Sequence, residues 1–355
     1  MQTTESRDSD ELHAAVNRCV RQAGLDERAS RDPEWVDKLR MQLTRASEQA
    51  WAVQSPDVDA SRAALRLDTQ RALYAINRLR LYWCDDPGAY DNERSRVLAD
   101  FQDLLEAPWQ RWLAERVSTD ELEPVNAEST LRNWAERDLT PHPTPEGGWI
   151  AEEMSGDGYR RLLEIVSLNA LAESSQLSRA VGGAASPAQS MMFRILMEEY
   201  GAGRLEKKHS TYFARMLEAQ GMSTKPEAYF LRVPWEVLSS INQAFYLAEN
   251  KRFYLRFCGA FTYTELSTPV SFAGYARAAA RLGFTDGHSD YWALHVREDA
   301  RHGPWMLERV ALPLLEQFPE RRRDMLFGYA EQRSVENMAG AAVARACRAA
   351  SEGRQ

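Results

Sequence analysis

The sequence predicts an all-α protein, and three observations lead to this fold class. Apolar residues recur at the i, i+3, i+4 spacing of a helix along most of the chain. Alternating runs of β-branched residues, the usual mark of a strand, do not appear. Proline and glycine gather between the periodic segments, where helices end. The chain of 355 residues is 44% hydrophobic and 27% charged, an ordinary globular composition that is long enough for two domains.

The first part of the chain, residues 1–117, is expected to form a helical region. Its periodic segments are Trp35–Trp51, Ala60–Trp83 and Glu93–Val117. Pro87 and Gly88 follow the second segment and end it, because both residues destabilise a helix interior. Pro108 lies inside the third segment and should kink it.

Residues 118–158 break this rhythm and are predicted to be a linker. They contain Pro124, Pro141, Pro143, Pro145, Gly147, Gly148, Gly156 and Gly158. Only Leu131–Arg137 could form a short helix there. Residues 159–355 return to helical periodicity and are expected to form the second domain. Its predicted helices are Tyr159–Val181, Pro187–Gln220, Pro234–Ala248, Arg252–Thr268, Val270–Leu282, Ser289–Phe318 and Arg321–Ala350.

Charge and cysteine content narrow the possible partners. The net charge of −8 lacks the basic excess of nucleic-acid binders, so we expect no nucleic-acid partner. No apolar run approaches the roughly 18 residues of a membrane span, and the N-terminal residues lack the apolar stretch of a signal peptide. The cysteines are Cys19, Cys84, Cys258 and Cys347. Their wide spacing excludes paired-cysteine zinc or redox motifs and suits a reducing, cytoplasmic environment.

The first candidate metal-binding motif lies in the predicted helix over 187–220. Glu206 and His209 form a Glu-x-x-His pair on one helical face, and Glu199 lies two turns earlier. Helical bundles use this unit to hold pairs of iron ions. Carboxylate and imidazole suit iron or manganese, and no thiolate is present to favour zinc. Taken alone, however, the pair also fits a solvated salt-bridge face.

The second motif is His295, Asp299 and His302, at positions i, i+4 and i+7. On a helix these residues fall within an arc of about 60°. Two imidazoles and a carboxylate on one face form a ready set of metal ligands. A third helix contributes Glu173, which interrupts an apolar surface where an unpaired carboxylate would be costly.

Together these residues resemble the ligand set of the heme-oxygenase-like di-iron oxidases and oxygenases, a family of iron-containing redox enzymes. The segment Glu199–His209 resembles the family's second core helix. Thr264–Pro269, followed by a helix and then by the His/Asp/His helix, resembles the usual order of its motifs. The resemblance covers Tyr159 to the C-terminus and implies a heme-oxygenase-like helical bundle. Residues 1–117 resemble the helical N-terminal extension that some members use for dimer contacts, which implies a homodimer.

The resemblance also implies the cofactors. These are two iron ions cycling between Fe(II) and Fe(III), O₂ as co-substrate, and an external electron donor, either a redox partner protein or a reductant. One iron would take Glu173, His209 and His302. The other would take Glu199, His295 and Asp299, with Glu206 bridging. Glu199 and Glu206 would be the catalytic carboxylates.

For the reaction, the resemblance favours N-oxygenation of a small amine or guanidine, derived from an amino acid, in a biosynthetic pathway. The reason is Glu199, because an additional carboxylate on the second core helix is characteristic of the family's N-oxygenases. Desaturation or C–C cleavage of an amino or fatty acid is the alternative. Several arginines near the motifs could hold a substrate carboxylate or could be solvated charges: Arg194, Arg204, Arg297 and Arg301.

Glu265 is expected to lie behind the ligands. A ferritin-like arrangement would make it a ligand, but His295 would then have no role. Three other classes of protein are less consistent with the motifs. An iron-storage protein would not need three histidines at one site. A haem protein would need a single proximal histidine, and a helical interaction protein would leave the motifs without a function.

Overall fold

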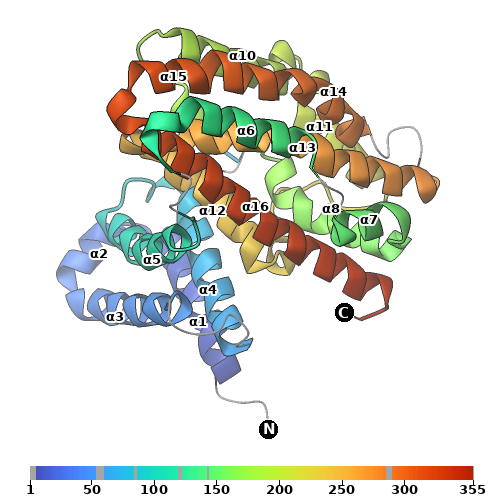
Figure 1. The fold of residues 1–355 in the computed structure, drawn as a ribbon. Helices are drawn as coiled ribbons and strands as arrows, with labels where there is room; N and C mark the ends of the chain where they lie inside the picture. Colours follow the sequence, from blue (N-terminus) through green and yellow to red (C-terminus); the bar gives the residue numbers. More distant parts are fainter. Residues whose placement is uncertain are drawn as a thin grey trace. The chain divides into compact units, whose positions relative to one another are not determined.

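The computed structural model describes residues 5–52, 60–83, 86–118, 122–141, 144–284 and 290–354. Throughout these ranges the regular structure is helical, and the predicted all-α fold class is confirmed (Figure 1). The chain divides into two compact units. The first unit is Met1–Arg116 with Ile241–Gln243, and the second is Val117–Ser240 with Ala244–Gln355.

The first unit contains α1 (Glu5–Val20), α2 (Leu25–Arg31), α3 (Pro33–Ala50), α4 (Ala60–Asn77) and α5 (Arg96–Ala114). Helix α3 begins with a proline, whose missing N–H costs nothing in the first turn. Ser95 caps α5 by accepting a hydrogen bond from the backbone N–H of Leu98 at 3.3 Å. Helix α5 continues through Pro108 and buries Phe101 and Trp109 in the core of this unit.

The predicted linker is not a linker. Residues 118–158 carry α6 (Ala127–Leu139) and α7 (Pro145–Glu152), and both helices belong to the second unit. Of the prolines that indicated a loop, Pro145 stands at the start of α7 and Pro124 at the start of a 3₁₀ turn, while Pro141 follows α6 and Pro143 lies outside the described residues. Leu131 and Trp134 of α6 are buried in the core, and Tyr329 donates a hydrogen bond to Asp138 at 2.7 Å.

The remaining helices form the rest of the second unit. They are α8 (Gly156–Ala170), α9 (Ser175–Ala180), α10 (Pro187–Glu199), α11 (His209–Ala219), α12 (Trp235–Glu249), α13 (Tyr254–Arg281), α14 (Asp290–Trp305), α15 (Leu312–Gln317) and α16 (Arg322–Ser351), with a π-helical segment at Met306–Ala311. The long helices α13 and α16 lie side by side (Figure 1). Gly259 and Gly328 stand at their contact, where any Cβ would collide with the facing backbone.

Helix α13 corrects a predicted boundary. The sequence predicts two helices separated at Pro269, but α13 runs through this residue. Pro269 has no N–H to donate to the carbonyl of Glu265 four residues earlier, and the hydroxyl of Thr268 donates to the carbonyl of Thr264 at 2.7 Å in the turn before it. The predicted helices over 159–181 and 187–220 are each interrupted, and both interruptions lie at the candidate site.

No helix within the described ranges is both long and apolar enough to cross a membrane.

Candidate metal centre

Glu199 and His209 stand at two helix ends joined by a short loop. Helix α10 ends at Glu199 because residues 201–203 have left-handed backbone conformations, with φ of 62°, 51° and 81°. Gly201 is required at its position, since a Cβ there would lie 2.5 Å from the carbonyl carbon of Lys207. The chain then re-enters a helix at His209, so both side chains are presented at the same loop.

Glu206 does not lie where the sequence predicts. The helical pairing of Glu206 with His209 is wrong, because a 3₁₀ turn at Gly201–Gly203 and another at Leu205–Lys207 replace the helix between α10 and α11. Glu206 lies in the second turn with its side chain exposed to solvent. It belongs to neither group of clustered donors described below.

Glu173 lies in the turn between α8 and α9. Helix α8 ends at Ala170 and α9 begins at Ser175. The turn is closed by Ser174 at φ 56°, a left-handed conformation that costs a non-glycine residue roughly 1–2 kcal/mol. The strained turn brings Glu173 to α14, where the hydroxyl of Tyr291 donates to its Oε1 at 2.6 Å.

The remaining predicted ligands are buried side chains of α14. His295, Asp299 and His302 are 3%, 3% and 0% exposed. The Nδ1 of His295 lies 2.9 Å from the carbonyl oxygen of Tyr291. Because a carbonyl only accepts, Nδ1 carries a proton and Nε2 faces the neighbouring carboxylates.

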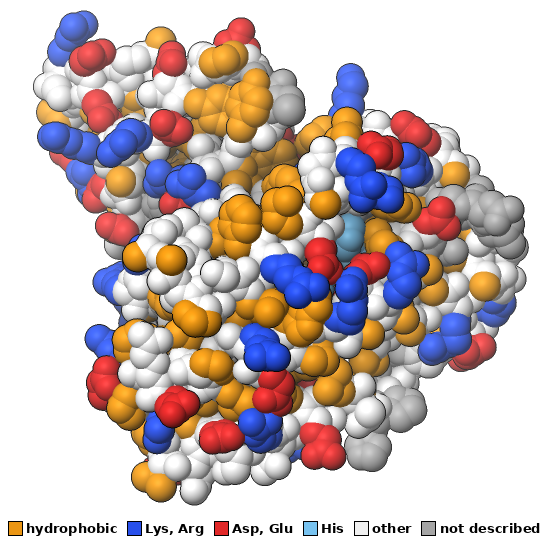
Figure 2. Space-filling model, turned by 90° about the horizontal axis from the view of Figure 1, so that it is seen from above, with side chains coloured by type: hydrophobic (Ala, Val, Ile, Leu, Met, Phe, Trp, Pro, Cys, Tyr) orange, Lys and Arg blue, Asp and Glu red, His pale blue; other side chains and the backbone are white. Residues whose placement is uncertain are grey.

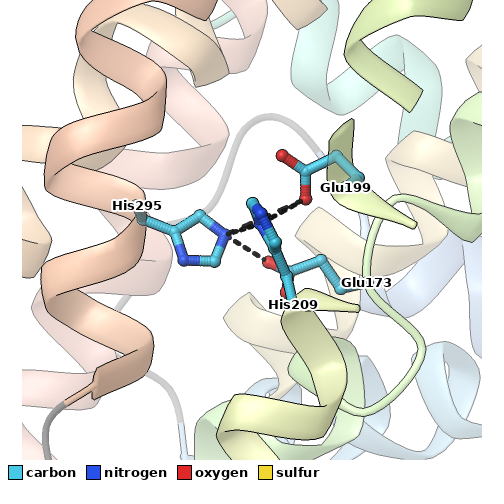
Figure 3. A group of neighbouring side chains, drawn as sticks. All are labelled: Glu173, Glu199, His209 and His295. Carbon is cyan, nitrogen blue, oxygen red and sulfur yellow. Dashed lines mark hydrogen bonds and ion pairs between the residues drawn. The ribbon is translucent and has the colours of Figure 1, made fainter. Parts of the chain in front are cut away.

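Four of these side chains form a first cluster, which combines Glu173, Glu199, His209 and His295. Figure 3 shows the four side chains pointing toward one another from separate segments. The Nδ1 of His209 lies 2.9 Å from Glu199 Oε2 and 3.2 Å from His295 Nε2. His295 Nε2 lies 3.1 Å from Glu173 Oε1.

A second cluster combines Glu199, Asp299 and His302. The Nδ1 of His302 lies 3.2 Å from Asp299 Oδ1 and 3.5 Å from Glu199 Oε1. Glu199 therefore takes part in both clusters, with Oε2 facing the first and Oε1 facing the second.

This grouping differs from the one that the resemblance implies. His295, rather than His302, lies beside Glu173. The carboxylate common to both clusters is Glu199, whereas Glu206 is in solvent.

The donor atoms fit metal ions in two respects. Ligands of one cation at about 2.1 Å lie roughly 3–3.5 Å from one another, close to the separations above. In addition, Glu173 Oε2 is buried and makes no hydrogen bond within the described part of the chain, while Glu199 Oε2, Asp299 Oδ1 and His302 Nδ1 face charged side chains of the site itself. A buried polar atom without a hydrogen bond is costly, and a cation would satisfy it. A set of carboxylates and imidazoles without thiolate suits iron or manganese.

Without a cation, His295 and His302 carry compensating positive charge. Burial alone would lower the pKa of His295, but the carboxylate of Glu173 outweighs burial and raises the pKa to about 10. Burial likewise opposes protonation of His302, and hydrogen bonds to Asp299 and Glu265 raise its pKa to about 11. A metal ion would therefore replace protons at this site.

The two buried carboxylates Glu199 and Glu265 have pKa values shifted in opposite directions. Burial would raise the pKa of Glu199, but the hydrogen bond and charge of His209 lower it to about 2. Burial and the charge of Asp299 raise the pKa of Glu265 to about 8. Glu199 is thus held in its ionised form, whereas Glu265 gains a proton more readily than an ordinary glutamate.

Three further residues border the clusters: Glu265, which the sequence predicts behind the ligands, and Glu198 and Tyr291, which it does not single out. Glu265 Oε2 lies 3.4 Å from His302 Nδ1, so Glu265 borders the second cluster. Glu198 Oε2 lies 3.1 Å from the other nitrogen of His302, Nε2. Tyr291 contacts Glu173. For Glu265, the spacing from Asp299 was a signal in the sequence that it could lie near the site. The contacts of Glu198 and Tyr291 depend on how separate helices pack, so no signal in the sequence points to them.

The arginines near the motifs are mostly engaged with glutamates. Arg194 and Arg301 both contact Glu198, at 3.4 and 3.1 Å, and Arg297 contacts Glu298 at 3.1 Å. In Figure 2 one histidine side chain is visible on the face drawn, set among acidic and basic side chains. The protein surface close to the clusters is therefore highly charged.

Comparison with known proteins identifies the family of the segment that contains both clusters. Residues 160–336 match a family model described as iron-containing redox enzyme. The nitrosourea synthase of Streptomyces achromogenes subsp. streptozoticus is 35% identical over 147 residues, which cover 41% of this chain and 31% of that protein. The chain thus spans less than a third of this relative's length. The resemblance stated from the motifs is confirmed, and through residues 160–336, which contain both clusters, the chain belongs to the family of iron-containing redox enzymes.

Proposed function

We propose that this protein is a non-haem di-iron oxygenase that uses O₂ to oxidise the nitrogen of a small amine or guanidine. The observation that carries the di-iron part is the position of Glu199. Its two carboxylate oxygens face two separate groups of donors, each containing histidine and a second carboxylate. Such a shared carboxylate is what a pair of neighbouring cations requires.

Two features support the N-oxygenase part. The first is the similarity to nitrosourea synthase, whose name describes a product with an oxidised nitrogen. The second is Glu199 itself, the additional carboxylate of the second core helix. Its ionised form, with a pKa lowered to about 2 by the hydrogen bond of His209 against the effect of burial, keeps negative charge at the metal site.

The reaction has a defined balance of atoms and electrons. One atom of O₂ bonds to the substrate nitrogen and gives a hydroxylamine, and the other leaves as water. This requires two electrons and two protons beyond those of the amine, so an external donor, either a redox protein or a small reductant, must supply the electrons. Bound Fe(II) supplies the centre at which O₂ is reduced.

The chain's own residues hold the metals and keep water away. The ring of Phe272 packs edge-on against His295 with centroids 5.2 Å apart, and the ring of Tyr291 lies 4.4 Å from it. The ring of Phe213 packs edge-on against the ring of Tyr291, with centroids 5.0 Å apart. This aromatic wall gives the first cluster a dry surrounding, in which charged interactions are stronger than in water.

One of the nearby arginines is suited to an amino-acid-derived substrate. Arg204 makes no ion pair with a carboxylate within the described residues, and its Nε contacts only the carbonyl of Gly201 at 3.5 Å. It lies on the loop that joins Glu199 to His209. We therefore infer that Arg204, rather than Arg194, Arg297 or Arg301, holds a substrate carboxylate.

Isotope labelling tests the reaction type. The protein is loaded anaerobically with Fe(II), mixed with ¹⁸O₂ and a reductant, and screened by mass spectrometry against amino acids, amines and guanidines. The expected product carries label on nitrogen. An unlabelled alkene, or a product of C–C cleavage, would contradict N-oxygenation and support the alternative of C–H chemistry at the same site.

A further inference from the structure

Glu198 lies directly beside a ligand of the second cluster, although neither the motifs nor the family resemblance single it out. His302 is fully buried, and both of its ring nitrogens face carboxylates. Nδ1 faces Asp299 at 3.2 Å and Glu199 at 3.5 Å. Nε2 lies on the opposite edge of the ring, 3.1 Å from Glu198 Oε2.

This arrangement determines which nitrogen of His302 can bind a metal. A neutral imidazole carries one proton, and the nitrogen without the proton is the ligand. Glu198 accepts a hydrogen bond from the Nε2–H of His302, so it favours the tautomer of His302 that carries its proton on Nε2. That leaves the lone pair of Nδ1 directed toward Asp299 and Glu199.

Glu198 is itself held in place from the protein surface. Its Oε2 accepts from Arg301 at 3.1 Å, and its Oε1 accepts from Arg194 at 3.4 Å. The guanidinium of Arg194 in turn lies over the ring of Trp305, 4.1 Å from its centroid. The carboxylate therefore has contacts on both oxygens, which limits its freedom to rotate away from His302.

We propose that Glu198 is a positioning residue of the second metal, which accepts the Nε2 proton of His302 and thereby directs Nδ1 of this histidine to the ion. The inference rests on the proposed metal centre and extends it to a residue outside the ligand set. A carboxylate that orients a metal-binding histidine commonly affects metal affinity 10–100-fold when it is removed.

The chain offers a matched control in Glu298. Like Glu198, it pairs with Arg301, but within the described residues its ion-pair partners are Arg297 and Arg301 and do not include His302. If Glu198 were only a surface ion-pair partner of Arg301, the two glutamates would be equivalent, and each pair would contribute little.

Anaerobic titration with Mn(II), followed by electron paramagnetic resonance, provides the test. Wild-type protein, Glu198→Ala, Glu198→Gln and Glu298→Ala are compared, with circular dichroism to check the fold. We expect Glu198→Ala to weaken one of two Mn(II) sites about 10–100-fold. Glu198→Gln should recover most of this loss, because its amide oxygen can accept the same proton, and Glu298→Ala should match wild type.

Nitrogen NMR of histidine-labelled protein loaded with diamagnetic Zn(II) gives an independent readout. The expected spectrum shows His302 protonated at Nε2 and metal-bound at Nδ1. Equal Mn(II) binding by Glu198→Ala and Glu298→Ala, or a metal bound at Nε2, would overturn the inference. Absence of Mn(II) binding by wild-type protein would instead overturn the proposed metal centre, so the two failures are distinguishable.

Discussion

Glu199 is the residue on which both clusters depend, because its two oxygens face different groups of donors. Removing it should therefore affect both metals. In Glu199→Ala we expect iron content after anaerobic loading to fall below one ion per chain, measured by elemental analysis of desalted protein.

Glu206→Ala is the matched comparison for Glu199→Ala. Because the side chain of Glu206 is exposed and outside both clusters, this variant should retain the iron content of wild type. Loss of iron in Glu206→Ala would contradict the geometry and show that residues 200–208 refold when metal binds.

Tyr291 offers a second prediction at the residue scale. Its hydroxyl donates to Glu173 Oε1, and burial together with the charge of Glu173 raises the pKa of Tyr291 well above 10, so it stays a donor. Tyr291→Phe keeps the ring and removes the donor. We expect iron affinity of the first cluster to fall about 10-fold.

Tyr159→Phe is the control for Tyr291→Phe. Tyr159 is an equally buried tyrosine whose hydroxyl accepts from Trp292 Nε1 at 2.9 Å, and Trp292 is not a metal ligand. If both variants bind iron alike, Tyr291 has no role in orienting Glu173.

At the scale of helices, Gly303 stands where α14 packs tightly against α13. A Cβ at this position would lie 2.9 Å from Leu266 Cδ2 and 3.0 Å from the carbonyl oxygen of Glu265. Gly303→Ala should therefore push the two helices apart and lower the free energy of unfolding by about 1–3 kcal/mol. Because His302 and Glu265 flank this contact, iron binding at the second cluster should weaken too.

Gly340 is the matched helical glycine for this test. A Cβ there meets nothing within 4 Å, so Gly340→Ala should stabilise α16 by up to about 1 kcal/mol and leave iron binding unchanged. Chemical denaturation together with iron titration measures both effects. Equal stability of Gly303→Ala and wild type would mean that the helices can separate at no cost.

The sequence correctly predicted that the candidate ligands of α14 share one face, but it did not predict the loop after α10. The difference has a physical reason. His295, Asp299 and His302 lie on one uninterrupted helix, so a periodicity of 3.6 residues suffices to group them. Residues 201–203 leave the right-handed helical region. The predicted pairing of Glu206 with His209 is wrong because it assumes an unbroken helix across these residues. Their two glycines were a visible turn signal.

The contacts of Glu198 and Tyr291 could not be predicted in the same way. Glu198 reaches His302 from α10, and Tyr291 reaches Glu173 across a turn, so both contacts depend on how separate helices pack. Prolines misled the prediction in residues 118–158 because a proline at the start of a helix and a proline in a loop look alike without the surrounding structure.

At the scale of the whole molecule, metal binding should be coupled to protons. The pKa of His295 is raised to about 10 and that of His302 to about 11, in both cases by neighbouring carboxylates against the effect of burial. Both imidazoles are therefore protonated near pH 7 in metal-free protein and must lose protons to bind a cation. Affinity should rise with pH toward these values and fall as the pH is lowered.

Calorimetry in two buffers of different ionisation enthalpy measures this coupling. The apparent enthalpy of Mn(II) binding should depend on the buffer, in the direction that corresponds to proton release. An enthalpy independent of the buffer would mean that the histidines are already neutral or are not ligands.

The proposed metal centre requires that two metal ions share Glu199, and anaerobic Fe(II) titration monitored by Mössbauer spectroscopy tests this most directly. The predicted result is binding of two iron ions per chain, which give the signature of a magnetically coupled pair after exposure to O₂. Saturation at a single iron ion, or two ions without coupling, would contradict it.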